Sequence, residues 1–218
     1  MENTGNVIII GARADGHAKV VLEILQTVNK YQVVGFVDDK LYSKKHNIRG
    51  IPVIGTTDQL VKLKKEYNLV GGIVAIGDNP TRRQLGDKIK NAKLILINAI
   101  HPSVHFDSDV ELGEGNYIGQ GVIIITGTKI GNHVNIHTAA SIDHDNIIND
   151  GANLSPGVHT AGRVIIGKDA FLGTGAKVIP DSKIGEGSVI GAGGVVIKNI
   201  EPYCLYVGVP AEFKKKLR

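Results

Sequence analysis

One histidine of this chain lies between two carboxylates, a combination suited to proton transfer. His144 follows Asp143 and precedes Asp145. A histidine titrates near neutral pH, and a neighbouring carboxylate orients its ring, so the group is suited to act as a general base. The alternative is a surface histidine whose acidic neighbours are incidental.

A second group of polar residues follows two apolar runs near the N-terminus. Asn6–Ile10 leads into the turn 11–16, which has glycine at both ends, and Gln32–Val37 ends at Asp38 and Asp39. Such a turn brings backbone N–H groups to a phosphate or ribose, and the acids accept hydrogen bonds from ribose or base. The turn lacks the central glycine of GxGxxG, which argues against a nicotinamide-dependent oxidoreductase. We therefore expect a mononucleotide-linked ligand; ordinary turn chemistry is the alternative for the acidic pair.

These turns need alternating strands and helices to position them. Further apolar runs lie at 51–54, 70–76 and 94–100, and helical patterns lie at about 18–29, 58–67 and 80–91. This alternation is typical of a small parallel α/β sheet of the Rossmann type. Pro102 disfavours continuation of the preceding element. We therefore predict an N-terminal Rossmann-like domain over 1–100 and a second domain over 101–218.

The second domain contains a six-residue repeat that runs unbroken from residue 104 to residue 199. The third position of each hexad is a large apolar residue, and only Thr160 departs from this rule. Hexapeptide periodicity predicts a parallel β-helix whose third-position side chains point inward. Three hexads per triangular coil give about five coils. Glycine is frequent at the fourth and sixth positions, where we expect turns with positive φ.

The repeat also decides how the histidines are placed. His144 is at a fifth position, near a corner, where its side chain should point outward or into a subunit interface. His133, His137 and His144 recur at spacings of four and seven residues. In a β-coil that spacing spreads them over different faces, so we expect no metal site.

Composition excludes several other classes of protein. The chain has 218 residues, a net charge of +4, 5% aromatic residues and one cysteine. Few aromatics and a small charge argue against nucleic-acid binding, although the basic excess in the first hundred residues suits an anionic ligand. A single cysteine excludes an internal disulfide and suits a reducing cytoplasm. With no signal segment and no apolar stretch near ~18 residues, we expect a cytoplasmic protein without membrane insertion.

Seven motifs together resemble one family. They are GARADGHAKVV (11–21), FVDD (36–39), AIGDN (75–79), HPS (101–103), SIDHD (141–145), FLGTGAKV (171–178) and VGVPA (207–211). On these the chain resembles bacterial sugar-nucleotide N-acetyltransferases of the left-handed β-helix superfamily with an N-terminal Rossmann-like domain. That branch includes acetyltransferases of UDP-4-amino sugars in the bacillosamine pathway and of GDP-perosamine, and sialic acid O-acetyltransferases.

The resemblance implies a left-handed coil, a homotrimer with active sites between neighbouring prisms, and acetyl-CoA as co-substrate. The family's base falls on His144 and its modulating acid on Asp145. The sugar-nucleotide contacts fall on Asp15, Gly16, His17, Asp38, Asp39 and Asn79. The acetyl-CoA contacts fall on Asn153, Gly162, Thr174 and Ala192, and some relatives carry a histidine in place of Asn153.

We therefore predict acetyl transfer to the 4-amino group of a nucleotide-linked amino-deoxy sugar for cell-surface glycan synthesis, and the resemblance favours UDP. His144 removes the amine proton during direct attack on the thioester, and the N–H of Gly162 stabilises the oxyanion. Cys204 is a poor nucleophile because no base neighbours it in sequence. The alternatives are O-acetylation of sialic acid or a related sugar, and a non-catalytic β-helix protein that binds nucleotides.

Overall fold

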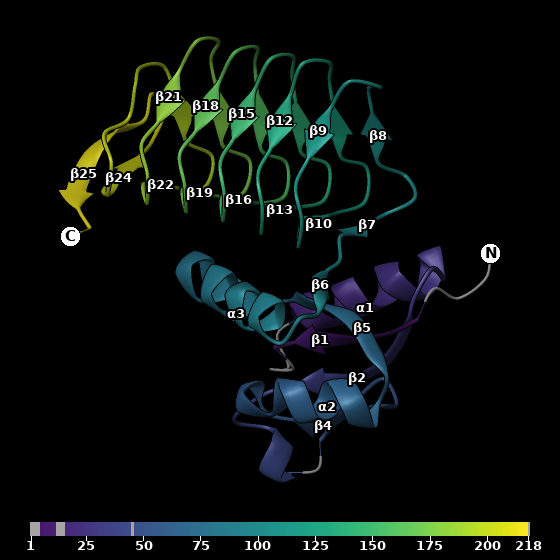
Figure 1. Ribbon diagram of the computed structural model, residues 1–218. Helices are drawn as coiled ribbons and strands as arrows, with labels where there is room; N and C mark the ends of the chain where they lie inside the picture. The colour runs from purple at the N-terminus through teal and green to yellow at the C-terminus, as the bar shows by residue number, and fades with distance from the viewer. Residues whose placement is uncertain (1–4, 12–15, 45, 218) are drawn as a thin grey trace. The chain divides into compact units, whose positions relative to one another are not determined.

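The computed structural model describes residues 5–11, 16–44 and 46–217 of the chain. The chain divides into two compact units, Met1–Pro102 and Ser103–Arg218. The first combines helices with a sheet, and the second stacks short strands coil upon coil (Figure 1). No helix in the described ranges is long and apolar enough to cross a lipid bilayer.

The sheet of the first unit forms from the apolar runs of the sequence. Its strand order is β3-β4-β2-β1-β5-β6, and all pairings are parallel except that of β3 with β4. The strands are β1 Asn6–Ile10, β2 Gln32–Val37, β3 Asn47–Ile48, β4 Ile51–Gly55, β5 Leu69–Val74 and β6 Ile95–Leu96. Because β2 and β5 flank β1, three carboxyl ends meet at one edge, where open α/β sheets bind ligands.

Helices connect these strands and bury apolar residues against the sheet. α1 buries Ala18, Val21, Leu22 and Leu25, which recur at helical spacing. Asp78 caps α3 by accepting a hydrogen bond from the N–H of Thr81 at 3.0 Å. The helices are α1 Gly16–Val28, η1 Tyr42–Lys44, η2 Thr57–Gln59, α2 Leu60–Glu66 and α3 Asn79–Asn91.

Two predicted elements of this unit differ from the structure. The predicted strand 94–100 is two strands, β6 and β7 (Ala99–Ile100), because β6 pairs with β5 over Gly71 and Gly72 only. The predicted helix 58–67 is the 3-10 turn η2 followed by α2. Apolar runs and helical patterns do not show where backbone hydrogen bonding ends or changes type. Neither the break between β6 and β7 nor the one between η2 and α2 could therefore be predicted from the sequence.

The second unit is a parallel β-helix whose strands are two residues long. Strands pair with residues one coil away, as Tyr117 does with Asn135 and Asn135 with Asn153. Three sheets run along the prism, and we name them C, D and E. Sheet C contains β10 Tyr117–Ile118, β13 Asn135–Ile136, β16 Asn153–Leu154, β19 Phe171–Leu172 and β22 Val189–Ile190. Sheet D contains β8 His105–Phe106, β11 Ile123–Ile124, β14 Ser141–Ile142, β17 His159–Thr160, β20 Lys177–Val178 and β23 Val195–Val196. Sheet E contains β9 Glu111–Leu112, β12 Lys129–Ile130, β15 Ile147–Ile148, β18 Ile165–Ile166 and β21 Lys183–Ile184.

Side chains at two positions of each hexad fill the prism. The third-position residues are buried from Ile118 to Val196, as predicted, and those of the first coil are half-buried. First-position residues are buried as well, and some of these are polar, including Asn116, Thr128 and Asn146. The interior therefore holds a second column of side chains at each corner.

Glycines at the corners serve two purposes rather than the single one predicted. The sixth position takes the left-handed conformation, with φ of 72° at Gly127 and 57° at Asp145. Gly173, at a fourth position, has no such φ; a Cβ there would lie 2.6 Å from the backbone nitrogen of Ala192 in the next coil. Glycine at the fourth position is thus required because neighbouring coils approach too closely for a side chain. The prediction of positive φ at that position is wrong.

Thr160, the exception among the third positions, lies between Ile142 and Val178 in sheet D. Its hydroxyl is buried and has no hydrogen-bond partner among the described residues. Thr160→Val removes this unpaired hydroxyl at nearly constant volume, so the free energy of unfolding should rise by about 1 kcal/mol. Thermal unfolding tests this, with Thr128→Val as control, because the Thr128 hydroxyl donates to the carbonyl of Asp143 at 3.0 Å. Equal destabilisation of both variants would contradict the prediction.

The repeat ends in a hairpin that adds to sheet C. β24 (Cys204–Val207) pairs parallel with β22, and β25 (Glu212–Lys216) pairs antiparallel with β24. Cys204 is buried and free, with its sulfur 3.3 Å from the carbonyl oxygen of Pro202. A buried thiol with a carbonyl partner is a poor nucleophile.

Candidate active site

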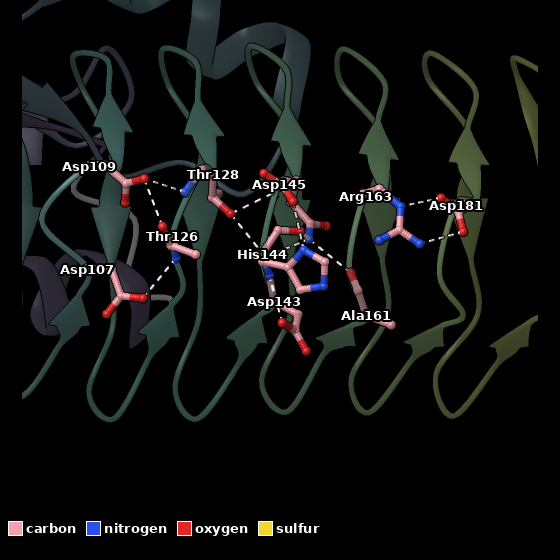
Figure 2. A network of polar contacts seen from close by, with 12 residues as sticks. Asp107, Asp109, Thr126, Thr128, Asp143, His144, Asp145, Ala161, Arg163 and Asp181 are labelled. Carbon is pink, nitrogen blue, oxygen red and sulfur yellow. Dashed lines mark hydrogen bonds and ion pairs between the residues drawn. The ribbon is translucent and has the colours of Figure 1, made fainter.

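His144 and Asp145 form a hydrogen-bonded pair at the corner between sheets D and E. The Nδ1 of His144 lies 2.8 Å from Oδ2 of Asp145, and the backbone N–H of His144 donates to Oδ1 of Asp143 at 2.7 Å (Figure 2). The His144 side chain is 41% exposed. With Nδ1 held by the carboxylate, Nε2 is the ring atom left to exchange a proton with a substrate.

Two glycines, one in each neighbouring coil, make room for this pair. A Cβ on Gly162 would lie 2.3 Å from Nε2 of His144, and a Cβ on Gly127 would lie 2.3 Å from Oδ1 of Asp145. Real Cβ atoms do not approach other atoms so closely, so any larger residue would displace the imidazole or the carboxylate. The ring therefore lies directly beside the backbone of Gly162.

The backbone N–H of Gly162, a buried residue, has no hydrogen-bond acceptor among the described residues. The N–H of Arg163, by contrast, donates to the carbonyl of His144 at 2.9 Å. A free backbone N–H next to a candidate base is the arrangement that stabilises an oxyanion in acyl transfer. Gly162 thus combines a backbone N–H without an acceptor with the space that the ring of His144 needs.

Charged residues continue along the same edge on both sides of the pair. Arg163 donates to both carboxylate oxygens of Asp181, at 2.6 and 2.9 Å, which raises the pKa of the Arg163 guanidinium and lowers that of the Asp181 carboxyl. On the other side, Asp109 accepts hydrogen bonds from the Thr126 hydroxyl at 2.8 Å and the Gly127 N–H at 3.0 Å (Figure 2). The bond from Thr126 is the main cause of the lowered pKa of Asp109. The hydrogen bonds of Arg163, Asp181 and Asp109 go to partners other than His144 and Asp145.

The predicted acetyl-CoA contacts do not gather in one place within one chain. Gly162 lies beside His144, but Thr174 and Ala192 follow strands of sheet C and lie at the corner between sheets C and D. Asn153 lies on β16 of sheet C and is buried. Its Oδ1 lies 3.2 Å from Nε2 of His137, and its Nδ2 donates to the hydroxyl of Ser155 at 3.3 Å.

The first unit has a cavity of about 520 Å³ at the carboxyl ends of β1, β2 and β5. Its lining includes Gly11, Asp38, Asp39, Gly77, Asp78 and Thr81. Gly16 and His17 begin α1 and are not among the lining residues, and Asp15 lies outside the described residues. The acidic pair therefore lies where a parallel sheet binds ligands.

The two acids of this cavity also hold the surrounding turns. Oδ1 of Asp38 accepts from the N–H groups of Lys40 and Leu41 at 2.9 and 3.0 Å. Asp39 accepts from the Thr57 N–H at 2.7 Å and from its hydroxyl at 3.1 Å. Ligand contact and turn chemistry are thus not exclusive here, because both acids hold turns and also line the cavity. The sequence carried no signal for Thr57, because it comes from a distant turn.

Asn79 lies behind the cavity wall rather than in it. It is buried, and its Oδ1 accepts a hydrogen bond from Nη2 of Arg82 at 2.9 Å. Arg82 is fully buried and also donates to the carbonyl of Ile76 at 3.0 Å. Both residues thus hold the loop that presents Gly77 and Asp78. The sequence gives no sign of this role of Arg82, because its local pattern does not distinguish a buried helical arginine from a solvent-exposed one.

No group of three or more His, Cys, Asp or Glu residues in the described ranges is arranged to hold a metal ion. The candidate site of the repeat is the His144–Asp145 pair beside the backbone N–H of Gly162. That of the first unit is an acidic cavity at the edge of a parallel sheet.

Comparisons with known proteins agree with both units. Residues 6–89 match the PglD N-terminal domain, and residues 163–198 match the bacterial transferase hexapeptide. Over 191 residues the chain is 32% identical to the GDP-perosamine N-acetyltransferase of Escherichia coli O157:H7, covering 85% of this chain and 82% of that protein. It is also 36% identical over 121 residues to a serine acetyltransferase of Buchnera aphidicola, but spans only 41% of that protein.

Solved structures extend the match to nearly the whole chain. A histidine-to-asparagine variant of the perosamine N-acetyltransferase from Caulobacter crescentus, in complex with CoA and GDP-perosamine, has a TM-score of 0.91 and 39% identity and covers 98% of both chains. The acetyltransferase domain of PglB from Neisseria gonorrhoeae, in complex with acetyl coenzyme A, has a TM-score of 0.88 and 31% identity, over 96% of this chain and 98% of that one. The predicted fold class, a Rossmann-like α/β domain followed by a left-handed parallel β-helix, is confirmed. The chain belongs to the family of bacterial sugar-nucleotide N-acetyltransferases, acyltransferases in which a PglD N-terminal domain precedes a β-helix of hexapeptide repeats.

Proposed function

We propose that this protein transfers the acetyl group of acetyl-CoA to the 4-amino group of a nucleotide-linked amino-deoxy sugar, for cell-surface glycan synthesis. The observation that carries the proposal is the His144–Asp145 pair beside the free N–H of Gly162. The relatives with CoA and GDP-perosamine bound support the two substrates.

The reaction is a direct transfer. The neutral amine attacks the thioester carbonyl, Nε2 of His144 takes one amine proton, and the N–H of Gly162 stabilises the oxyanion. Collapse of the tetrahedral intermediate breaks the C–S bond, and the CoA thiolate leaves with a proton from the imidazolium. The Caulobacter variant, in which asparagine replaces a histidine, supports a histidine as base.

We propose that the working unit is a homotrimer. His144 and Gly162 lie at the corner between sheets D and E, whereas Thr174 and Ala192 lie at the corner between sheets C and D. One acetyl-CoA can touch both groups when a neighbouring copy brings its own corner to the first. Closed symmetric assembly of identical prisms supplies that neighbour.

Of the nucleotide carriers, we propose GDP first and UDP second. The resemblance favours UDP, but the relatives from Escherichia coli and Caulobacter crescentus are associated with GDP-perosamine. The cavity wall includes Asp38, Asp39 and Asp78. Carboxylates accept hydrogen bonds, and guanine offers more N–H donors than uracil does, so three carboxylates suit guanine better.

The test is release of CoA thiol from acetyl-CoA with a panel of GDP-, UDP- and dTDP-linked 4-amino-6-deoxy sugars, together with a sialic acid. Turnover on one amino sugar, with product mass increased by one acetyl group, supports the proposal and identifies the nucleotide. Release with sialic acid alone would replace N-acetylation by O-acetylation. Nucleotide binding without any thiol release would reduce the protein to a nucleotide-binding β-helix.

Asp39→Asn should weaken nucleotide-sugar binding selectively. The amide can still accept from the Thr57 N–H, so the turn is kept while the charge is lost. A hydrogen bond to a charged group contributes about 1.5–3 kcal/mol, so KM for the sugar nucleotide should rise roughly tenfold or more. KM for acetyl-CoA should stay unchanged, and steady-state kinetics with each substrate varied in turn measures both. An equal rise of both KM values would contradict a role confined to the nucleotide.

A further inference from the structure

A polar side chain lies inside the prism directly behind the His144 corner. The interior column at the corner between sheets D and E consists of first-position residues, in order Val110, Thr128, Asn146, Val164 and Ser182. Asn146 is fully buried, in the coil that carries His144. Burying an amide among aliphatic side chains is unfavourable unless its hydrogen bonds are made. The hydrogen bonds of Asn146 therefore indicate its role in this corner.

The amide nitrogen of Asn146 binds three backbone carbonyls. Nδ2 donates to the carbonyls of Asp143 at 2.7 Å and His144 at 3.1 Å, which belong to its own coil. It also donates to the carbonyl of Ala161 at 2.9 Å, which belongs to the next coil. Oδ1 has no partner among the described residues, so one half of the amide is left unsatisfied while the other half is fully used.

The contact with Ala161 fixes the direction of the Gly162 N–H. The carbonyl of Ala161 and the N–H of Gly162 belong to one peptide unit, which is planar and trans, so the two groups point in opposite directions. Because the buried Asn146 holds the carbonyl toward the interior, the N–H of Gly162 points away from the interior. Donation to the carbonyl also polarises the same peptide and strengthens its N–H as a donor.

Thr128 completes the inner support. Its hydroxyl donates to the carbonyl of Asp143 at 3.0 Å and accepts from the backbone N–H of Asn146 at 3.3 Å. The turn that carries His144 is therefore held from inside by two fully buried polar residues (Figure 2 shows Thr128 and Ala161 on either side of it).

Asn116 provides an internal comparison. It is also fully buried at a first position, but at the corner between sheets E and C. Both halves of its amide are used: Nδ2 donates to Gly131 at 2.9 Å and Oδ1 accepts from Val134 at 2.7 Å. Both halves of the Asn116 amide are therefore hydrogen-bonded, as is usual in a protein core. Asn146 differs because it bonds only through Nδ2, and only to backbone carbonyls next to His144 and Gly162.

We propose that Asn146 is a positioning residue that holds the turn of His144 in register with the peptide of Gly162. The inference deepens the proposed function and rests on it. Without Asn146, the imidazole of His144 and the N–H of Gly162 would both be present but no longer correctly placed relative to each other. The chemical step is then slowed, whereas the binding of either substrate is not.

The test compares Asn146→Val, Asn146→Thr and Asn116→Val. Asn146→Val introduces the residue found at 110 and 164 of the same column and should lower kcat at least ~10-fold, with both KM values within about twofold. Asn146→Thr restores one donor, as Thr128 does in the coil below, and should recover part of the loss. Asn116→Val should leave kcat unchanged even where it lowers thermal stability. Equal kcat losses at 146 and 116, or wild-type kcat in Asn146→Val, would overturn the proposal.

A double-mutant cycle with His144→Ala separates positioning from a general structural role. Without the imidazole there is no register to keep, so Asn146→Val should cost much less in that background than in the wild type. An equal cost in both backgrounds would overturn the inference while leaving the proposed function in place.

A crystal structure of Asn146→Val tests the inference without turnover. We expect the turn 143–145 to shift and the 2.8 Å contact between His144 and Asp145 to lengthen or break. An unchanged turn would overturn the inference. If the wild type turns over no substrate of the panel, the proposed function fails, and this structure still decides whether Asn146 holds the turn.

Discussion

Replacing His144 by alanine should lower kcat at least ~10²-fold while the protein stays folded and assembled. The ring is the group whose Nδ1 is held by Asp145 and whose Nε2 lies beside the backbone of Gly162. Without it the attacking amine has only water to take its proton. The His144 side chain is 41% exposed, so its loss leaves no cavity in the core and the midpoint of thermal unfolding should stay near that of the wild type.

The matched control is His105→Ala. His105 also contacts a carboxylate, with Nε2 3.0 Å from Oδ1 of Asp107, and it too lies at the surface of the repeat. Its variant should keep full turnover, because an incidental histidine–carboxylate pair has no role in the reaction. Wild-type kcat in a folded His144→Ala protein would remove the proposed base, and equal losses in both variants would point to the fold rather than to the site.

Gly162→Ala should cost ~10²-fold in kcat, although it adds a single methyl group and removes no reacting atom. The new Cβ would lie 2.3 Å from Nε2 of His144, so the ring must turn away from Asp145 and from the Gly162 N–H. Because the ring is half-exposed it can turn toward solvent, and the free energy of unfolding should change by no more than about 1 kcal/mol. Single-turnover rates, with thermal unfolding measured in parallel, test both parts.

The decisive comparison adds Gly162→Ala to His144→Ala. Without the imidazole the methyl group has space, so the double variant should be less than about threefold slower than His144→Ala alone. A much larger further loss would show that the alanine disturbs something other than the ring. Gly162→Ala with wild-type kcat would mean that the imidazole does not work from this position.

The sequence predicted the β-helix because one aliphatic side chain per hexad must point inward in every coil. It did not predict that first positions such as Asn146 point inward too, because their residue types vary. It placed Asp38 and Asp39 at a strand end, which was enough to locate them on the cavity wall. It misjudged the surroundings of Asn79, since the burial of Arg82 depends on packing that no local pattern encodes. The proximity of His144 and Gly162 follows from their separation of one coil in the repeat. That the imidazole occupies the space where a Gly162 side chain would lie is visible only in the structure.

Each strand of the repeat pairs with residues one coil away, so the register of every coil depends on the number of residues in the coils before it. Deleting a single residue between Gly127 and Gly162 would turn third-position side chains outward and move at least one glycine away from the His144–Asp145 pair. Duplicating one complete coil beyond Gly162 would leave every column in phase. Insertion of a whole coil therefore keeps the pairing of the strands, whereas a change of one residue near His144 breaks it.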